Sequence, residues 1–286
     1  MKMKTKAFIL ASVLAAGFGL AGWQADFDDA FAASRKGPVT LTFTYVSVYP
    51  ASVVLHANYP GPAKPDKALW NSGDGWHSYT SKTIPLHSPV LRFRGDWRDS
   101  SGRLYSMFNG TFPSSAGMVR MTGGFDVSGA PAASMFYGTF YGDSGLTGSI
   151  PAGLFGDISG APAAYMFYGT FNGCNKLTGS IPAGLFGDIS GAPAPYMFRL
   201  TFYGDSGLTG SIPAGLFGAI SGAPADSMFY GTFNGCNKLT GASATMPDGV
   251  TKLWEQFPTA TGTQCDNCYL NASGLSDYAT IPTAWK

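Results

Sequence analysis

Residues 129–159 read GAPAASMFYGTFYGDSGLTGSIPAGLFGDIS, and the next two stretches of the chain repeat this sequence almost unchanged. Residues 160–190 read GAPAAYMFYGTFNGCNKLTGSIPAGLFGDIS, and residues 191–221 read GAPAPYMFRLTFYGDSGLTGSIPAGLFGAIS. The period is 31, and the first two copies agree at 26 of 31 positions. A fourth copy decays after Gly241, and an earlier, looser copy begins at Met107. A fixed period of this length predicts a repeat architecture.

Every copy carries the same apolar skeleton, which in the first copy consists of Met135, Phe136, Phe140, Leu146, Ile150, Leu154, Phe155 and Ile158. A single repeat unit cannot bury so many large side chains alone, whereas stacked neighbours cover each other's exposed faces. Pro131 is placed to open a helical turn, on which Phe136 and Phe140 share one face. Residues 146–150 form a short extended segment that Pro151 ends. The sequence therefore predicts an α/β repeat solenoid with one short parallel strand in each repeat.

The repeats also resemble a known family. The pattern F-x-G-C-x-x-L-T-x-x-I-P at residues 171–182, found in part at 233–241, resembles the repeat of the BspA-like leucine-rich-repeat surface proteins. LTGSIP is also similar to the LTGxIP core of plant-type leucine-rich repeats. The resemblance covers about residues 105–245 and implies a curved, leucine-rich-repeat-like solenoid, although the period of 31 and the extra GDISGAPA segment depart from the family. A parallel β-helix is the alternative fold.

The N-terminus has the features of a secretory signal peptide. Three lysines precede the apolar run at residues 7–22, and Ala30 and Ala32 supply small residues at positions −3 and −1 of a cleavage site. We therefore expect residues 1–32 to be a signal peptide, and an N-terminal membrane anchor is the alternative. The mature chain is then secreted or held at the cell surface, in a bacterium, without a transmembrane segment.

Three regions are expected in the mature chain. Alternating apolar and hydroxyl residues from Val39 to Val48 predict a half-buried strand, and shorter candidates follow, so residues 38–104 are predicted to form a small all-β module. The solenoid is expected over residues 105–252. Residues 253–286 are expected to form a degenerate capping repeat, because a naked end would expose core. Trp70, Trp76 and Trp97 either pack inside the β module or form an aromatic platform for a sugar, and packing is the preferred interpretation.

The composition argues against catalysis and against nucleic acid. Only 12% of residues are charged, and the chain contains a single glutamate, Glu255, and three histidines. General acid–base chemistry depends mostly on such side chains, and the sequence contains no GxSxG, HExxH or P-loop motif. The formal net charge of +1 does not suit a polyanionic nucleic acid. We expect no enzymatic activity and no cofactor.

Charge is divided between the two halves of the mature chain. Residues 33–120 hold ten Lys and Arg against four Asp, a net charge of +6, and residues 121–286 hold five Lys and Arg against ten acids, a net charge of −5. One interpretation is a β module with a basic face of no particular role. The other is that this module docks to an anionic envelope or polysaccharide.

Cysteines and aspartates offer weak candidates for chemistry. Cys265 and Cys268 form a single CxxC motif, for which a local disulfide in an exported chain is the preferred interpretation over a zinc or redox site. Cys174 and Cys236 occupy one repeat position two copies apart, and the resemblance to leucine-rich repeats, in which this position turns inward, implies that they are buried free thiols. Four aspartates recur with the repeats, namely Asp143, Asp157, Asp188 and Asp205. A calcium ladder needs several oxygen ligands for each ion, so we expect no metal site.

Tyrosines are the best functional signal in the repeats, because each copy has more aromatic residues than its core can hold. Tyrosine offers a large contact area at a low cost in side-chain entropy. The candidate ligand-binding residues are Tyr137, Tyr141, Tyr168, Asn172, Tyr203, Tyr230 and Asn234, although packing of the tyrosines is an equally good interpretation. The resemblance to the BspA-like surface proteins implies an adhesin-like protein that binds a protein or glycan on a cell surface or matrix. The alternative is a self-associating structural module of a cell envelope or secreted assembly.

Overall fold

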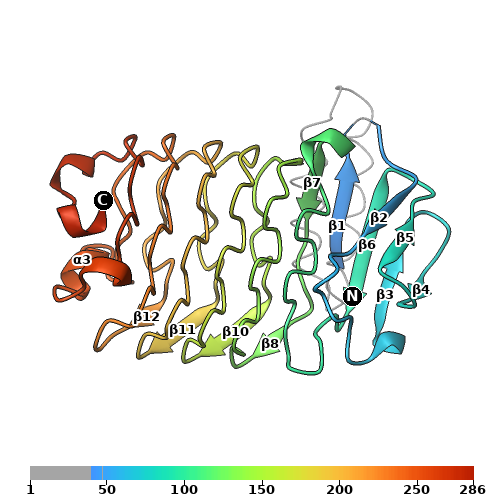
Figure 1. Cartoon of the computed structure of the whole chain (residues 1–286), viewed down its shortest axis with the longest axis horizontal. Coiled ribbons are helices and arrows are strands. Elements are labelled where there is room, and N and C mark those ends of the chain that lie inside the picture. Colours follow the sequence, from blue (N-terminus) through green and yellow to red (C-terminus); the bar gives the residue numbers. More distant parts are fainter. Residues whose placement is uncertain (1–39, 47) are drawn as a thin grey trace, which may run out of the picture. The chain divides into compact units, whose positions relative to one another are not determined.

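The computed structural model describes residues 40–46 and 48–286, which belong to one compact unit, Pro38–Lys286. The predicted signal peptide at residues 1–32 lies outside the described residues. The described part of the chain consists mostly of short strands in mixed and parallel sheets, with few helices (Figure 1). None of the helices in this part is long and apolar enough to cross a membrane.

A six-stranded sheet opens the described chain, with the strand order β4-β3-β6-β1-β7-β9. Its strands are β1 (Thr40–Tyr45), β3 (Ala68–Asn71), β4 (His77–Ser78), β6 (Val90–Gly95), β7 (Val119–Thr122) and β9 (Leu146–Thr147). A separate antiparallel pair joins β2 (Ser52–Val54) to β5 (Thr83–Pro85). Short 3-10 helices occupy Pro65–Lys67 and Ser114–Ala116. The alternation predicted for the first strand is confirmed, because every second residue of β1, starting at Leu41, is buried.

The sheet passes directly into the repeats. β7 pairs with β1 in the antiparallel sense and with β9, which belongs to the first repeat copy, in the parallel sense. Val119 stands opposite Leu146, and Arg120 stands opposite Thr147. The first repeat copy is therefore covered on one side by the sheet that precedes it.

Successive copies pair in parallel along two lines. One line is the four-stranded sheet of β8 (Ser128–Gly129), β10 (Asp157–Gly160), β11 (Asp188–Gly191) and β12 (Ala219–Ile220). The other consists of the parallel bridges Gly148↔Leu177, Gly179↔Leu208 and Gly210↔Leu239. The sequence predicted an extended segment only at the second line. The first line lies in the GDISG segment, which has a single buried residue per copy, such as Ile158 in β10.

The helical turn predicted after Pro131 is replaced by a different backbone pattern. In the first copy, N–H groups bond forward to the next copy in the pairs Ser134 to Ala164, Phe136 to Met166, Gly138 to Tyr168, Phe140 to Thr170 and Gly142 to Asn172. The N–H groups between them bond to the carbonyl three residues earlier. Positive φ at Ser134 (58°) and Gly138 (54°) breaks any helix here. The α-helical contribution predicted for each repeat is thus wrong for the described residues, whose one α-helix is α3 (Leu253–Gln256).

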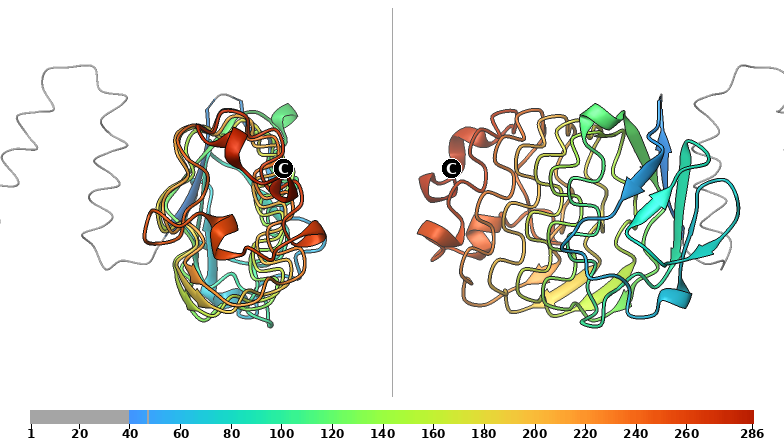
Figure 2. Two further views of the ribbon diagram at one scale, coloured as in Figure 1. Left: turned by 90° about the vertical axis from the view of Figure 1, so that its left-hand side faces the viewer. Right: turned by 45° about the vertical axis from the view of Figure 1, so that its right-hand side comes forward.

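Aligned phenylalanines fill the interior of the copies. The predicted row of Phe136, Phe167, Phe198 and Phe229 is confirmed, because all four are fully buried. Their neighbouring ring centroids lie 5.1, 5.6 and 5.8 Å apart with nearly parallel planes. A second row starts at Phe140, four residues further along each copy, with spacings of 5.5, 5.6 and 5.6 Å. Viewed along the rows, the copies overlie one another (Figure 2).

The C-terminal segment continues the same ladder. Phe229, Gly231, Phe233 and Gly235 donate N–H bonds to the carbonyls of Gln264, Asp266, Cys268 and Leu270. Besides α3, this segment holds the 3-10 helices Gly262–Gln264, Tyr278–Thr280 and Thr283–Trp285. The buried rings of Tyr269 and Trp285 lie 5.5 Å from Phe233 and 6.0 Å from Phe229, respectively. Apolar rings therefore cover the end of the phenylalanine rows.

Replacing Phe198 by alanine should destabilise the protein strongly. Its ring is fully buried and lies between Phe167 and Phe229, so the substitution removes contacts on both sides and leaves a cavity. Large-to-small changes of this kind cost about 3–5 kcal/mol. We expect chemical denaturation to show this loss, with hydrogen exchange faster in the neighbouring copies as well. Thr209→Ala, at an exposed position, serves as the control, and an equal midpoint for the two variants would contradict a core role for Phe198.

Candidate functional site

The alternating backbone of each copy turns two side chains outward, and in the first copy both are aromatic. In the first copy Phe136 and Phe140 point into the core, while Tyr137 and Tyr141 lie at the surface. The N–H of each core phenylalanine bonds to the next copy, so equivalent tyrosines are held in register along the copies. The tyrosines predicted from the sequence are consequently gathered on one side of the stacked copies.

The half-buried residues form a continuous stack, here called the tyrosine column and made of Tyr105, Tyr137, Tyr168, Arg199 and Tyr230. The Tyr105 and Tyr137 ring centroids lie 4.8 Å apart, and those of Tyr137 and Tyr168 lie 4.7 Å apart at an interplanar angle of 6°. Arg199 takes the tyrosine position in the third copy, with its guanidinium 4.1 Å from the Tyr230 ring centroid. Burial and the neighbouring tyrosines raise the pKa of Tyr137.

A second set, the outer column, consists of Tyr141, Asn172, Tyr203 and Asn234. Tyr141 and Tyr203 are the most exposed tyrosines of the repeats, at 43% and 41%. Gly169 places no side chain beside the Tyr141 ring, since a Cβ there would lie 3.3 Å from it. The outer column thus alternates exposed aromatic rings with amide groups along the surface.

Two further tyrosines belong to this surface and were missed by sequence reasoning. Tyr165 and Tyr196 stack at 4.5 Å and 2°, and the Tyr196 hydroxyl donates to a carboxylate oxygen of Asp226 at 2.8 Å. That hydrogen bond raises the pKa of Tyr196 and lowers the pKa of Asp226. The two tyrosines are one full period apart in the sequence, which was the available signal. Tyr105 had no such signal, because its spacing to Tyr137 is one position longer than the period.

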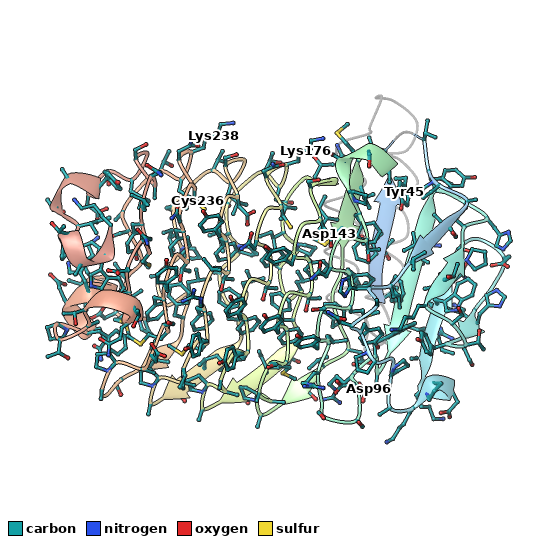
Figure 3. The ribbon with its side chains drawn as sticks, in the orientation of Figure 1. Tyr45, Asp96, Asp143, Lys176, Cys236 and Lys238 are labelled. Atoms are coloured by element: carbon teal, nitrogen blue, oxygen red, sulfur yellow. The ribbon has the colours of Figure 1, made fainter. Side chains whose placement is uncertain are left out.

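Asp143, Cys174, Asp205 and Cys236 form a second line inside the copies, here called the buried polar row. Asp143 accepts a hydrogen bond from the Phe112 N–H at 2.8 Å. The Cys174 thiol donates to the Phe140 carbonyl at 3.0 Å, and the Cys236 thiol makes the equivalent bond to Phe202. Figure 3 shows Asp143 and Cys236 within the stacked copies, beneath the outward-pointing Lys176 and Lys238. Burial raises the pKa values of both thiols well above their ordinary value, so they remain protonated.

All four cysteines are buried free thiols, which confirms the prediction for Cys174 and Cys236. The disulfide expected between Cys265 and Cys268 is not formed in the structure. The ladder places Cys265 at the position of Phe229 and Cys268 at that of Thr232 in the preceding copy. Both are therefore packed in the interior and not in a flexible end segment, and Cys265 donates to the Ala284 carbonyl.

The remaining candidates do not assemble into a site. Trp70 and Trp97 are buried, in agreement with the packing interpretation, whereas Trp76 is 37% exposed beneath the Arg94 guanidinium, which lies 4.0 Å from its ring centroid. The recurring aspartates divide into the buried Asp143 and Asp205 and the exposed Asp157 and Asp188. Within the described residues, no group of three His, Cys, Asp or Glu side chains gathers where it could hold a metal ion.

Comparison of the chain with family models, with curated proteins and with solved structures finds no match. Function is therefore inferred from the sequence and from the geometry of this surface.

Asp205 should make the stability of the protein depend on pH. Neither carboxyl oxygen makes a hydrogen bond within the described structure, and burial raises its pKa well above the ordinary value, an effect only partly offset by the backbone of Cys174. The folded state therefore retains a proton that the unfolded chain releases at about pH 3.9, a typical value for aspartate. This contribution to stability is complete below that pH and declines as the pH rises toward the folded-state pKa.

Asp205→Cys, which installs the side chain found at Cys174 and Cys236, isolates the effect. At pH 3.5, where Asp205 is largely protonated in both the folded and the unfolded state, the variant should be more stable than the natural protein by about 1–3 kcal/mol, the cost of an unsatisfied buried polar group. At pH 7 the gain should be larger, because folding of the natural protein then also requires Asp205 to take up a proton. Urea denaturation at both pH values provides the measurement, and a gain that does not change with pH would rule out titration of Asp205 as its cause.

Proposed function

We propose that this chain is an exported, surface-associated repeat protein that binds a protein or glycan through the tyrosine column and the outer column, without catalysis. The observation that carries this proposal is the aromatic stack itself. Tyr105, Tyr137 and Tyr168 lie face to face at 4.8 and 4.7 Å, and exposed tyrosines stand beside them. The stack holds the rings in one orientation before a ligand arrives, which lowers the entropy lost on binding.

The chemistry of this surface suits a neutral or weakly polar partner. Tyrosine combines an apolar ring with a hydroxyl, and the amides of Asn172 and Asn234 both donate and accept hydrogen bonds. Arg199 adds one cation in the middle of the tyrosine column, where it also donates to the Ser227 hydroxyl at 3.1 Å. A sugar or peptide lying along the copies would meet the same groups at regular intervals. Export and surface association rest on the signal-peptide features of residues 1–32.

The finer fold is part of the proposal. We infer a leucine-rich-repeat-like solenoid, related to the BspA-like surface proteins, over residues 105–252, with residues 253–286 as its cap. The bridges from Gly148 to Leu239 and the continuous rows of phenylalanine support a stack of equivalent units. A parallel β-helix is the second candidate. It is favoured by the additional parallel line of β8, β10, β11 and β12 and by the α-helix-free repeats of the described chain.

Removing the exposed rings should weaken binding. Each aromatic contact contributes about 0.5–1.5 kcal/mol, so Tyr141→Ala combined with Tyr203→Ala should lower the affinity about tenfold. The purified protein would first be screened on arrays of glycans and extracellular-matrix proteins, and each partner then titrated by calorimetry. Tyr49→Ala, which removes an exposed tyrosine outside both columns, is the matched control. Equal affinities for the double variant and the control would refute the tyrosine surface as the binding site.

The alternative, a structural module that assembles with copies of itself, makes a different prediction. End-to-end assembly would need open ends, but both ends of the stacked copies are covered. β7 covers one end, and Tyr269 and Trp285 cover the other. This favours a binding protein over end-to-end assembly. Light scattering coupled to size-exclusion chromatography should give one monomer mass from micromolar to millimolar concentration. Growth of the mass with concentration would favour the assembly instead.

A further inference from the structure

A cationic surface lies on the six-stranded sheet and shares no residue with the tyrosine column or the outer column. Side chains alternate between the two faces of a strand, so burial of Leu91 and Phe93 in β6 places Arg92 and Arg94 on the opposite face. In β7 the buried residues are Val119 and Met121, which leaves Arg120 outward. We call this surface the arginine face. It consists of Arg92, Arg94 and Arg120 together with Thr42, Thr44 and Thr122.

The strand register places hydroxyl groups between the guanidinium groups. Thr42 stands opposite Arg92 on one side and Thr122 on the other, and Thr44 stands opposite Arg120. Because neighbouring strands lie about 4.7–4.9 Å apart, Arg92 and Arg120 lie on either side of β1, separated by about 10 Å across the sheet and by about 7 Å along it. Arg92 and Arg94 lie two residues apart on one strand, a distance of about 7 Å. The face therefore presents spaced cations with hydrogen-bonding groups between them.

The four aspartates of residues 40–120 pair with other basic residues or with histidines. Asp66 pairs with Lys67 at 3.6 Å, Asp96 with Arg98 at 2.8 Å and Asp99 with Arg103 at 2.9 Å. The fourth, Asp74, lies between His77 and His87, at 3.0 and 3.3 Å from their Nε2 atoms. In contrast, no ion pair in the described structure involves any arginine of the arginine face.

Three guanidinium groups on one face without a counter-charge repel each other, so they do not stabilise the fold through charge. The arginines also do not fill the core, because the residues that alternate with them do so. Arg94 is stacked on Trp76, which holds one guanidinium in place against an aromatic ring. These arginines are held on one face without a counter-charge from the described chain, which indicates that their counter-charge is an external anion.

We propose that the arginine face binds a linear acidic polysaccharide. Guanidinium groups form paired, charge-assisted hydrogen bonds with carboxylate or sulfate groups, which a planar fork matches better than an ammonium does. The threonine hydroxyls between them both donate and accept, as the hydroxyls of a sugar chain require. A polymer also allows several weak contacts to act together. The arginine face would bind a charged ligand, whereas the tyrosine column and the outer column suit a neutral one. The two sites share no residue.

Negatively charged membranes are the competing source of anionic groups. Val46 and Met118, which are exposed and joined by a backbone hydrogen bond, lie just beyond β1 and β7 and offer an apolar contact. They stand at one end of the face, whereas the arginines and threonines alternate across it. The interleaved hydroxyl groups favour the polysaccharide, and the experiment includes the membrane as a separate arm.

The test measures binding of the purified protein to polygalacturonate, heparin, neutral dextran and vesicles containing half phosphatidylglycerol. We expect both acidic polysaccharides to bind in 50 mM NaCl, with affinity falling steeply at 300 mM because salt screens exposed charges. Dextran should not bind. No binding to either acidic polymer at low salt would overturn the proposal, and so would binding to the vesicles alone.

Matched variants separate the arginine face from overall charge. Arg92→Gln with Arg120→Gln removes two charges from the face, and Lys176→Gln with Lys238→Gln removes two from the exposed edge of the repeats (Figure 3). The arginine variant should lose at least tenfold in affinity, and the lysine variant less than twofold. Arg92→Lys with Arg120→Lys, which keeps the charge but not the fork, should lie between them. Equal losses for the arginine and lysine variants would reduce the interaction to non-specific attraction and refute the site.

Discussion

Each repeat copy commits alternate backbone N–H groups to the copy that follows it, and this constraint governs the rest of the structure. From Ser134 to Gly142, every second N–H bonds to a carbonyl of the next copy. Without the next copy these donors would have no partner in the protein, and apolar groups that covered them would leave them unpaired, which is costly. The copies therefore stabilise one another, and the last of them needs the carbonyls of Gln264 to Leu270.

The same backbone hydrogen bonds explain why equivalent side chains of successive copies form columns. They also explain why a different residue in one copy affects the copy beside it. Phenylalanines stack on phenylalanines because the forward bonds hold equivalent residues opposite each other. The third copy replaces the Tyr-Gly of its neighbours by Arg199-Leu200. Leu200 keeps the positive φ (56°) of the glycine position, which is strained for a leucine. Gly231 in the next copy also has a positive φ (62°), which favours glycine, and a Cβ there would lie 2.6 Å from the Leu200 Cδ2, so the leucine side chain would have to move.

The period of 31 was sufficient to predict the core rows and to place most tyrosines on one surface, because both follow from register alone. The backbone of the turn was not predictable in the same way. Phe136 and Phe140 share a side at a spacing of four residues both in a helix and in the observed alternation. The line of β8, β10, β11 and β12 was missed because GDISG offers one apolar residue per copy, too few to reveal a strand. Cys265 and Cys268 were expected in a flexible end, because an insertion before them breaks the period that would have aligned them with Phe229 and Thr232.

Charge counted from the sequence gives an incomplete account of the surface. The ten acids of residues 121–286 include Asp143 and Asp205, whose burial raises their pKa values and favours the neutral form. With both protonated, the net charge of this region changes from −5 to −3. Among residues 40–104 every aspartate is paired with a basic residue or a histidine. Five basic residues of the described stretch 40–120 make no ion pair, and three of them, Arg92, Arg94 and Arg120, belong to the arginine face. The division of charge along the chain therefore corresponds to a localised cationic surface on the sheet and to a weakly charged stack of copies whose outer face is aromatic.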